Sequence, residues 1–116
     1  MTVKLKEKRV QRAVTEFVHR LLEKKRYKDK IKSILMYGSA TKGKYNSKES
    51  DVDLLVVGSD YHIDEAILEI ETEISLKYGL MLSVLFNTPQ ELKQIKNMGY
   101  PLFKEIEKGN VLYERS

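Results

Sequence analysis

Residues 34–57, which read ILMYGSATKGKYNSKESDVDLLVV, decide the fold of this chain and point to its chemistry. Two apolar runs, residues 34–37 and 54–57, stand on either side of a polar and basic segment. Runs of this length and composition predict two buried strands joined by a loop. Both ends of that loop carry residues that could take part in chemistry.

Two carboxylates, Asp51 and Asp53, precede the second apolar run and are spaced two residues apart. On a strand such residues point to one face, about 7 Å apart. Two negative charges at that range repel by about 2–3 kcal/mol at an effective dielectric constant of about 20, and a cation would offset this repulsion. Acids at a strand end can simply be solvated, but the run at residues 54–57 indicates a central, buried strand. Oxygen ligands without Cys or a nearby His favour Mg²⁺ or Mn²⁺ over zinc.

Gly38 and Ser39 end the first apolar run and predict a sharp turn, because glycine adopts backbone conformations barred to other residues. If a helical turn begins within residues 40–44, its N–H groups and the Ser39 hydroxyl form a nest suited to phosphate. Taken alone, the same pair also fits an ordinary tight turn. Lys42 and Lys44 follow within the loop, close enough to assist chemistry there.

The composition predicts a single folded domain over residues 1–116, with 41% apolar and 33% charged residues. The chain has no cysteine, which excludes a disulfide framework, a thiolate metal site and a cysteine nucleophile. No stretch has the pattern of a signal peptide or a membrane span. We therefore expect a cytoplasmic protein that does not associate with membranes.

Basic residues concentrate at the N-terminus: residues 1–32 hold 12 Lys or Arg against 4 Asp or Glu, and the remaining 84 hold 9 against 13. Residues 1–30 are predicted to contain one amphipathic helix over about residues 5–27, from apolar residues at helical spacing. The lysines would then form a solvated helix face. A docking face for an acidic partner or nucleic acid, or a dimer surface, is the alternative.

The rest of the chain, residues 31–116, is predicted to form the core of the domain. Strands are predicted at residues 31–37, 51–57, 80–86 and 111–113, and helices at residues 63–78, 89–97 and 101–108. Thr88, Pro89 and Glu91 form a capping box with proline at the first helical position. The order α-β-β-α-β-α-α-β predicts an α/β (α+β) fold in which helices flank a small mixed sheet.

The pattern Gly-Ser, eleven residues, Asp-x-Asp between two strands resembles the nucleotidyltransferase superfamily of DNA polymerase beta and kanamycin nucleotidyltransferase. Residues 38–43, GSATKG, are similar to the family's Gly-Ser-x-Ala-Arg-Gly with Lys42 in the arginine place, and residues 50–56, SDVDLLV, fit its acidic strand. Residues 101–114, PLFKEIEKGNVLYE, resemble the ending of the stand-alone minimal nucleotidyltransferases (MNT proteins). The resemblance covers about residues 31–113.

This resemblance implies Mg²⁺- or Mn²⁺-dependent transfer of a nucleoside monophosphate to an acceptor hydroxyl. The first expectation is transfer of AMP from ATP. The two aspartates would hold the metal, Gly38 and Ser39 would bind the β- and γ-phosphates, and Lys42 and Lys44 would neutralise the leaving pyrophosphate. MNT proteins pair with HEPN-domain proteins as toxin–antitoxin modules in which the MNT member adenylylates its partner. The resemblance therefore implies a HEPN-domain partner and an antitoxin role.

One departure from the family pattern matters. The family adds a third carboxylate on the strand after the second helix, but here residues 80–86 read LMLSVLF, and Ser83 stands in the expected place. Serine brings no charge and is a poor base. Transfer with two acids and a non-catalytic module that binds nucleotide or a partner therefore both remain open.

A third reading is a nucleic-acid-binding protein that uses the basic N-terminal region. The lack of aromatic residues exposed among those lysines speaks against it. The acceptor, the base preference and a homo-oligomeric state are left open by the sequence.

Overall fold

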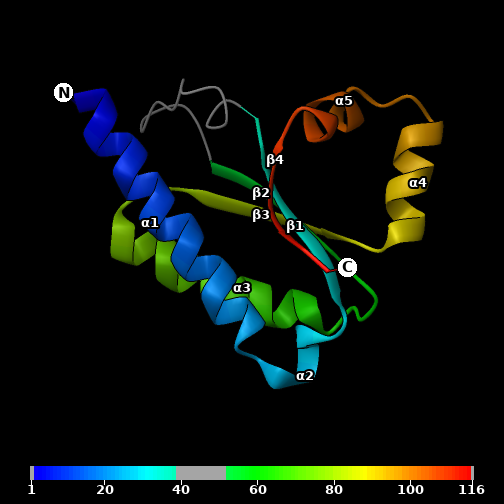
Figure 1. Ribbon diagram of the computed structural model, residues 1–116, viewed down its shortest axis with the longest axis horizontal. Coiled ribbons are helices and arrows are strands. Elements are labelled where there is room, and N and C mark those ends of the chain that lie inside the picture. The colour runs from blue at the N-terminus through cyan, green and yellow to red at the C-terminus, as the bar shows by residue number, and fades with distance from the viewer. Residues whose placement is uncertain (1, 39–51, 116) are drawn as a thin grey trace.

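The structure is a computed structural model that describes residues 2–38 and 52–115, with side chains described from Lys8 onward. The described elements are α1 (Thr2–Leu22), α2 (Lys25–Lys28), β1 (Ile31–Tyr37), β2 (Val52–Gly58), α3 (Ile63–Tyr78), β3 (Leu82–Asn87), α4 (Pro89–Asn97), α5 (Pro101–Glu107) and β4 (Asn110–Glu114) (Figure 1). All four predicted strands are therefore present, with ends shifted by two residues at most.

The sheet has the strand order β3-β2-β1-β4, so that β2 lies inside it. β1 pairs antiparallel with both β2 and β4, whereas β2 and β3 run parallel. The sheet is mixed and flanked by helices, which confirms the predicted fold class. Because an inner strand is covered on both faces, the consecutive residues Leu54, Leu55 and Val56 are all 0% exposed.

One face of the sheet is covered by α1 and α3, which pack against each other (Figure 1). Their apolar stripes meet alternate residues of β2 in one large cluster, which includes Phe17, Ile70, Val52, Leu54 and Val56. This face holds most of the buried apolar side chains of the described chain, so it supplies most of the hydrophobic stabilisation.

The opposite face is covered by α4 and α5, which contact β3 and β1 respectively (Figure 1). The buried cluster there is small and consists of Tyr37, Leu55, Val57 and Ile106, with partly buried leucines around it. Side chains alternate between the two faces of a strand, so Asp53 lies on the same face as Leu55 and Val57. The thinner layer therefore leaves room for polar side chains at the end of the sheet where β2 begins.

The single N-terminal helix predicted over residues 5–27 is wrong in its last turn. α1 ends at Leu22, and Lys24 takes an extended conformation (φ −76°, ψ 98°) before the short helix α2. This break lets Tyr27 turn into the core, where it is 7% exposed. The run Glu23–Arg26 contains no apolar residue, so hydrophobic periodicity carries no signal of the break.

The edge strand β3 is protected against pairing with a further strand. Along β3, side chains of α3 bond to the backbone: Ser75 Oγ accepts the N–H of Leu82 (3.1 Å), and Glu71 Oε2 accepts the N–H of Val84 (3.1 Å). These bonds occupy donors that another strand could otherwise pair with.

The predicted capping box at the start of α4 is confirmed, since Thr88 and Glu91 exchange side-chain and backbone bonds of 3.2 and 2.8 Å.

None of the helices in the described part of the chain combines the length and apolar composition needed to cross a membrane.

Candidate active site

Three side chains stand in one row across the sheet near the end where β2 begins. Tyr37, the last residue of β1, is the antiparallel partner of Asp53, and Asp53 is the parallel partner of Ser83 on β3. The Asp53 carboxylate is half-buried. The backbone of Asp53 is fixed by strand pairing on both sides. The preceding residue, Val52, also donates its N–H to the Met81 carbonyl at 2.8 Å. The position of Asp53 is therefore set by the sheet rather than by a loop.

Gly38 forms one wall of the space around the Asp53 carboxylate. Its φ is +84°, a left-handed conformation that favours glycine. A Cβ atom built at this position would lie 2.7 Å from Asp53 Oδ2, closer than any ordinary contact. Glycine is thus required here twice, by the backbone conformation and by the close approach of the carboxylate.

The same carboxylate affects the pKa of Tyr37. Its side chain is 6% exposed, and burial raises the pKa of its hydroxyl to about 12, with the negative charge of Asp53 adding to the shift. The sequence predicts only a buried strand residue at this position. Its place beside Asp53 follows from the antiparallel register, which apolar periodicity does not specify.

Four of the predicted site residues lie outside the described residues: Ser39, Lys42, Lys44 and Asp51. The other three come together in space: Gly38 directly follows β1, Asp53 lies on β2 and Ser83 lies on β3. The structure therefore brings the glycine of the predicted phosphate nest against one of the two predicted metal ligands. It also sets Ser83 beside that ligand.

The donors at this position suit a hard divalent cation only in part. The Asp53 carboxylate and the Ser83 hydroxyl are oxygen ligands of the kind that Mg²⁺ prefers. Within residues 2–38 and 52–115, no group of three or more His, Asp or Glu side chains could hold a metal ion. One carboxylate and one hydroxyl are too few, so a metal site here depends on Asp51, which precedes Asp53 by two residues.

Glu71 of α3 bonds to the backbone of β3, but it does not replace the missing third carboxylate. Burial raises its pKa, while its bond to the N–H of Val84 opposes that shift. Glu71 belongs to α3, on the sheet face opposite to Asp53, where its bond protects the sheet edge. β3 itself reads LSVLFN and carries no acid.

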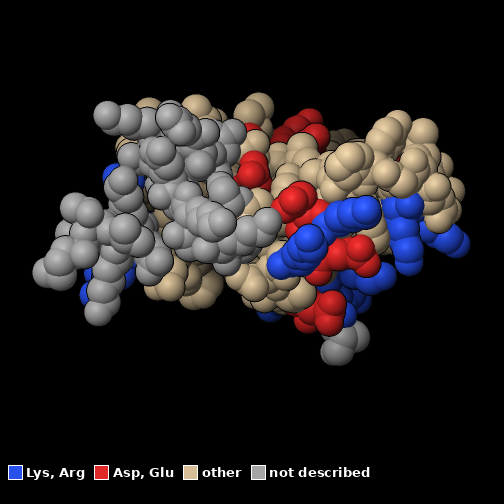
Figure 2. All heavy atoms as spheres, turned by 90° about the horizontal axis from the view of Figure 1, so that it is seen from above, with Lys and Arg blue, Asp and Glu red and all other residues tan. Residues whose placement is uncertain are grey.

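Figure 2 looks onto this end of the molecule. On the part of its surface that belongs to described residues, Lys and Arg side chains lie among Asp and Glu side chains.

Two solved structures share this fold. One from Sulfolobus solfataricus, described as a "putative nucleotidyltransferase", aligns with a TM-score of 0.55 and 14% identity, covering 99% of this chain and 89% of that chain. A chain from the toxin–antitoxin pair MntA–HpeT aligns with a TM-score of 0.52 and 17% identity, covering 85% of this chain and 71% of that chain. At these identities the likeness concerns the fold.

The sequence comparisons define the family. Residues 18–116 match the family "Polymerase beta, Nucleotidyltransferase". A Methanocaldococcus jannaschii protein named "Putative protein adenylyltransferase MJ0604" is 33% identical over 103 residues, which cover 89% of this chain and 97% of that protein. A second protein of the same organism, "Putative protein adenylyltransferase MJ0141", is 34% identical over 59 residues, 48% of this chain and 59% of that protein.

The chain therefore belongs to the polymerase beta-type nucleotidyltransferase family, and it is a nucleotidyltransferase. The resemblance to the minimal members of that superfamily, predicted from residues 38–43 and 50–56, is confirmed. Its general reaction is the transfer of a nucleoside monophosphate.

Proposed function

We propose that this chain transfers AMP from ATP to a hydroxyl group on a HEPN-domain protein, as the antitoxin of a toxin–antitoxin pair. The observation that carries the proposal is the Asp53 carboxylate, held by an inner strand against the backbone of Gly38. The names of the two Methanocaldococcus jannaschii relatives support a protein acceptor and an adenylyl donor. The fold shared with a chain of a toxin–antitoxin pair supports the biological setting.

Asp53 and Asp51 would hold Mg²⁺ or Mn²⁺ in this proposal. When bound, the metal ion would neutralise negative charge on the phosphate oxygens of the nucleotide. The close packing of Gly38 against Asp53 supports this assignment, since it keeps the phosphate-binding turn and the carboxylate next to each other.

The remaining predicted residues would act on the β- and γ-phosphates, which leave together as pyrophosphate. Gly38 and Ser39 would bind the β- and γ-phosphates through backbone N–H groups and a hydroxyl, and Lys42 and Lys44 would neutralise the departing pyrophosphate. The acceptor oxygen forms a bond to the α-phosphorus while the bond from that phosphorus to the pyrophosphate oxygen breaks. The acceptor proton passes to water, because Ser83 stands where a third carboxylate would otherwise accept it.

A labelling experiment tests the reaction directly. The chain is incubated with Mg²⁺, a HEPN-domain protein, and ATP labelled on either the α- or the γ-phosphate. Nucleotidyl transfer puts the α-label on the partner and leaves the γ-label in pyrophosphate, whereas phosphoryl transfer puts the γ-label on the partner and leaves the α-label in ADP. Chelation by EDTA should stop the labelling, and added Mg²⁺ or Mn²⁺ should restore it.

The matched variants are Asp53→Asn and Glu71→Gln, each of which exchanges a half-buried carboxylate for an amide. Asp53→Asn should lower the rate at least about 100-fold, as expected when a charged group that acts on the transition state is removed. Glu71→Gln should leave it within about twofold, because Glu71 lies on the opposite face. ATP binding without transfer to any acceptor would overturn the catalytic proposal in favour of a nucleotide-binding module.

Ser83 allows a test by gain of function. Ser83→Asp sets a carboxylate beside Asp53, whereas Ser83→Asn adds similar bulk without charge. If position 83 is the third acid position, Ser83→Asp should raise the transfer rate, and Mg²⁺ should stabilise it against heat more than it stabilises the natural chain. Equal behaviour of the two variants would show that position 83 does not reach the metal.

A further inference from the structure

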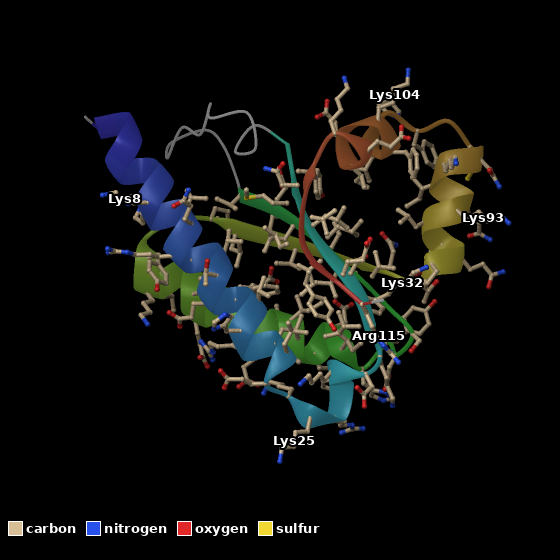
Figure 3. All side chains as sticks on the ribbon, in the orientation of Figure 1. Lys8, Lys25, Lys32, Lys93, Lys104 and Arg115 are labelled. Carbon is tan, nitrogen blue, oxygen red and sulfur yellow. The ribbon has the colours of Figure 1, made fainter. Side chains whose placement is uncertain are left out.

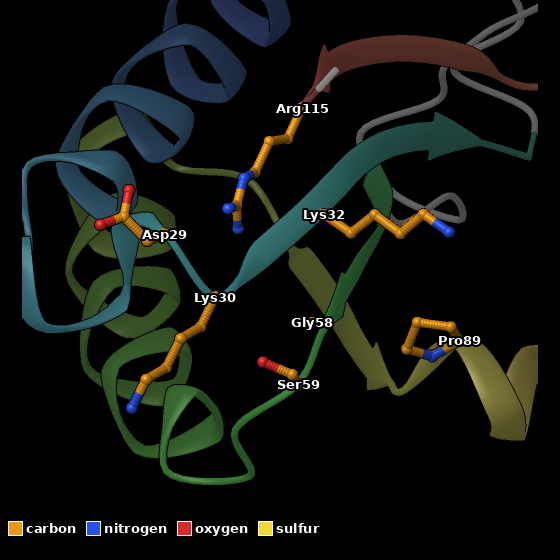
Figure 4. A pocket seen from close by; sticks show the side chains of 7 residues that line it. All are labelled: Asp29, Lys30, Lys32, Gly58, Ser59, Pro89 and Arg115. Carbon is orange, nitrogen blue, oxygen red and sulfur yellow. The ribbon is translucent and has the colours of Figure 1, made fainter.

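A basic groove lies at the other end of the sheet from Asp53. It consists of two hollows of about 330 and 380 Å³ that share Lys32 and Pro89, and we call it the distal groove. Arg115 and Ser59 also line the first hollow (Figure 4). The second hollow is lined on its charged side by Lys93 and Lys96 of α4.

The cations of the distal groove are mostly without ion pairs. Lys30 in the first hollow is the exception, because it bonds Asp60 at 3.1 Å. Lys32, Lys93 and Arg115 are exposed and form no ion pair with any residue that the structure describes. Among the described lining residues, Asp29 is the one acid of the first hollow, and the second hollow has none.

Like charges gather at this groove. Arg115 donates its backbone N–H to the Lys32 carbonyl at 2.9 Å, and the two side chains extend in different directions (Figure 4). Lys93 and Lys96 are three residues apart on α4, where like charges repel. A bound anion would offset this repulsion.

The second hollow also has an apolar floor. Exposed Pro89 and half-buried Leu92 and Phe103 line it beside the lysines. A nucleic acid strand would use exposed aromatic rings for stacking. Phe103 is half-buried and already lies under the Lys96 ammonium group, 5.8 Å from its ring centroid. A floor of aliphatic side chains fits apolar side chains of a protein better than it fits bases.

We propose that the distal groove is a docking site for an acidic protein segment that carries apolar side chains between its acids. Its acids would pair with Lys32, Lys93 and Arg115, and its apolar side chains would cover Leu92 and Pro89. Five separate parts of the chain converge on this site, namely the start of β1, the end of β2, α4, α5 and the residue after β4. The proposal does not depend on the transferase reaction.

A defined probe tests the proposal with the full chain. Fluorescence anisotropy is measured with a labelled peptide of about 12 residues that alternates Glu and Leu. A companion peptide has Ser in place of Leu, and a single-stranded RNA of equal charge is measured in parallel. We expect the Glu–Leu peptide to bind more tightly than either companion, and less tightly at about 0.3 M than at about 0.05 M salt because of screening.

Two triple variants separate the groove from general surface charge. The groove variant is Lys32→Gln with Lys93→Gln and Arg115→Gln. The control variant removes the same charge at sites outside the groove, with Lys8→Gln, Lys25→Gln and Lys104→Gln (Figure 3). Peptide binding should weaken about tenfold in the groove variant, at a fraction of a kcal/mol per lost pair, and less than about twofold in the control.

Either of two results would overturn the proposal. Equal loss of peptide binding in both variants would show a non-specific attraction to a basic protein. Tighter binding of the RNA, lost in the groove variant alone, would assign the groove to nucleic acid. Melting temperatures of both variants, compared with the natural chain, establish that the substitutions leave the fold intact.

Discussion

The two faces of the sheet differ in how they are covered and in what they carry. On the described residues, the face under α1 and α3 has a large continuous buried cluster, whereas the face under α4 and α5 has only Tyr37, Leu55, Val57 and Ile106 fully buried. Asp53 and the apolar floor of the distal groove both belong to the second face. A thick layer on one side stabilises the sheet, and the thin layer opposite leaves its two ends accessible.

The comparison teaches that stability and chemistry are placed on opposite sides of β2. Val52, Leu54 and Val56 point into the large cluster, while Asp53, Leu55 and Val57 point to the thin face. A charged side chain can therefore stand on an inner strand, because the alternate residues bury enough apolar surface to hold that strand in place.

The largest expected difference concerns core truncations on the two faces. Phe17→Ala should lower the free energy of unfolding by about 3–5 kcal/mol, because it opens a cavity in the large cluster where Phe17 is 0% exposed. Ile106→Ala should cost about 2 kcal/mol, because the thin layer can collapse more easily around the gap. Urea unfolding curves measure both. Equal losses would contradict the division into a thick and a thin layer.

Gly38→Ala tests whether the thin face is built around the Asp53 carboxylate. Gly79→Ala is the matched control, since Gly79 also has a positive φ (+63°) but no atom within 4 Å of a built Cβ. Both variants should lose about 1–2 kcal/mol of stability from the strained backbone. Only Gly38→Ala should also lose transferase activity, by at least about tenfold, because the new Cβ displaces Asp53. Loss of activity in both would point to stability alone.

Thr88→Ala tests how firmly α4 is attached to the thin face. The Thr88 hydroxyl accepts the N–H of Glu91 at 3.2 Å, and its removal should cost about 1 kcal/mol. Thr88→Ser retains the oxygen and should cost much less. Thermal melts of the two variants give the difference. A cost equal in both variants would attribute it to packing of the methyl group instead of the cap.

The smallest expected effect is on the ionisation of Tyr37. Its pKa of about 12 lies above the ordinary value of about 10, so its contribution to stability is complete below about pH 10 and is lost as the pH rises towards 12. Asp53→Asn removes a negative charge and should lower the pKa of Tyr37, while burial keeps it raised. The tyrosinate absorbance, with Tyr37→Phe to assign it, follows this change. An unchanged titration would place Asp53 too far from Tyr37 to act on it.

Much of the fold could be predicted from the sequence because its signals are local. The apolar run after Asp53 predicts an inner strand, and the capping box at Thr88 predicts the start of α4; both are present. The break after Leu22 could not be predicted, because the segment around Lys24 is polar throughout and Tyr27 is drawn into the core by tertiary packing. Local patterns do not contain that contact.

The sequence by itself determined the family, the position of the acidic strand and the absence of an acid on β3, since these depend on residue types and their spacing. Only the tertiary structure decided that Ser83 stands beside Asp53, that Gly38 leaves space for the carboxylate, and that the backbone of Arg115 bonds to that of Lys32. These neighbours come from different strands. Strand order and register arise from the packing of the whole sheet, and a single stretch of sequence does not specify them.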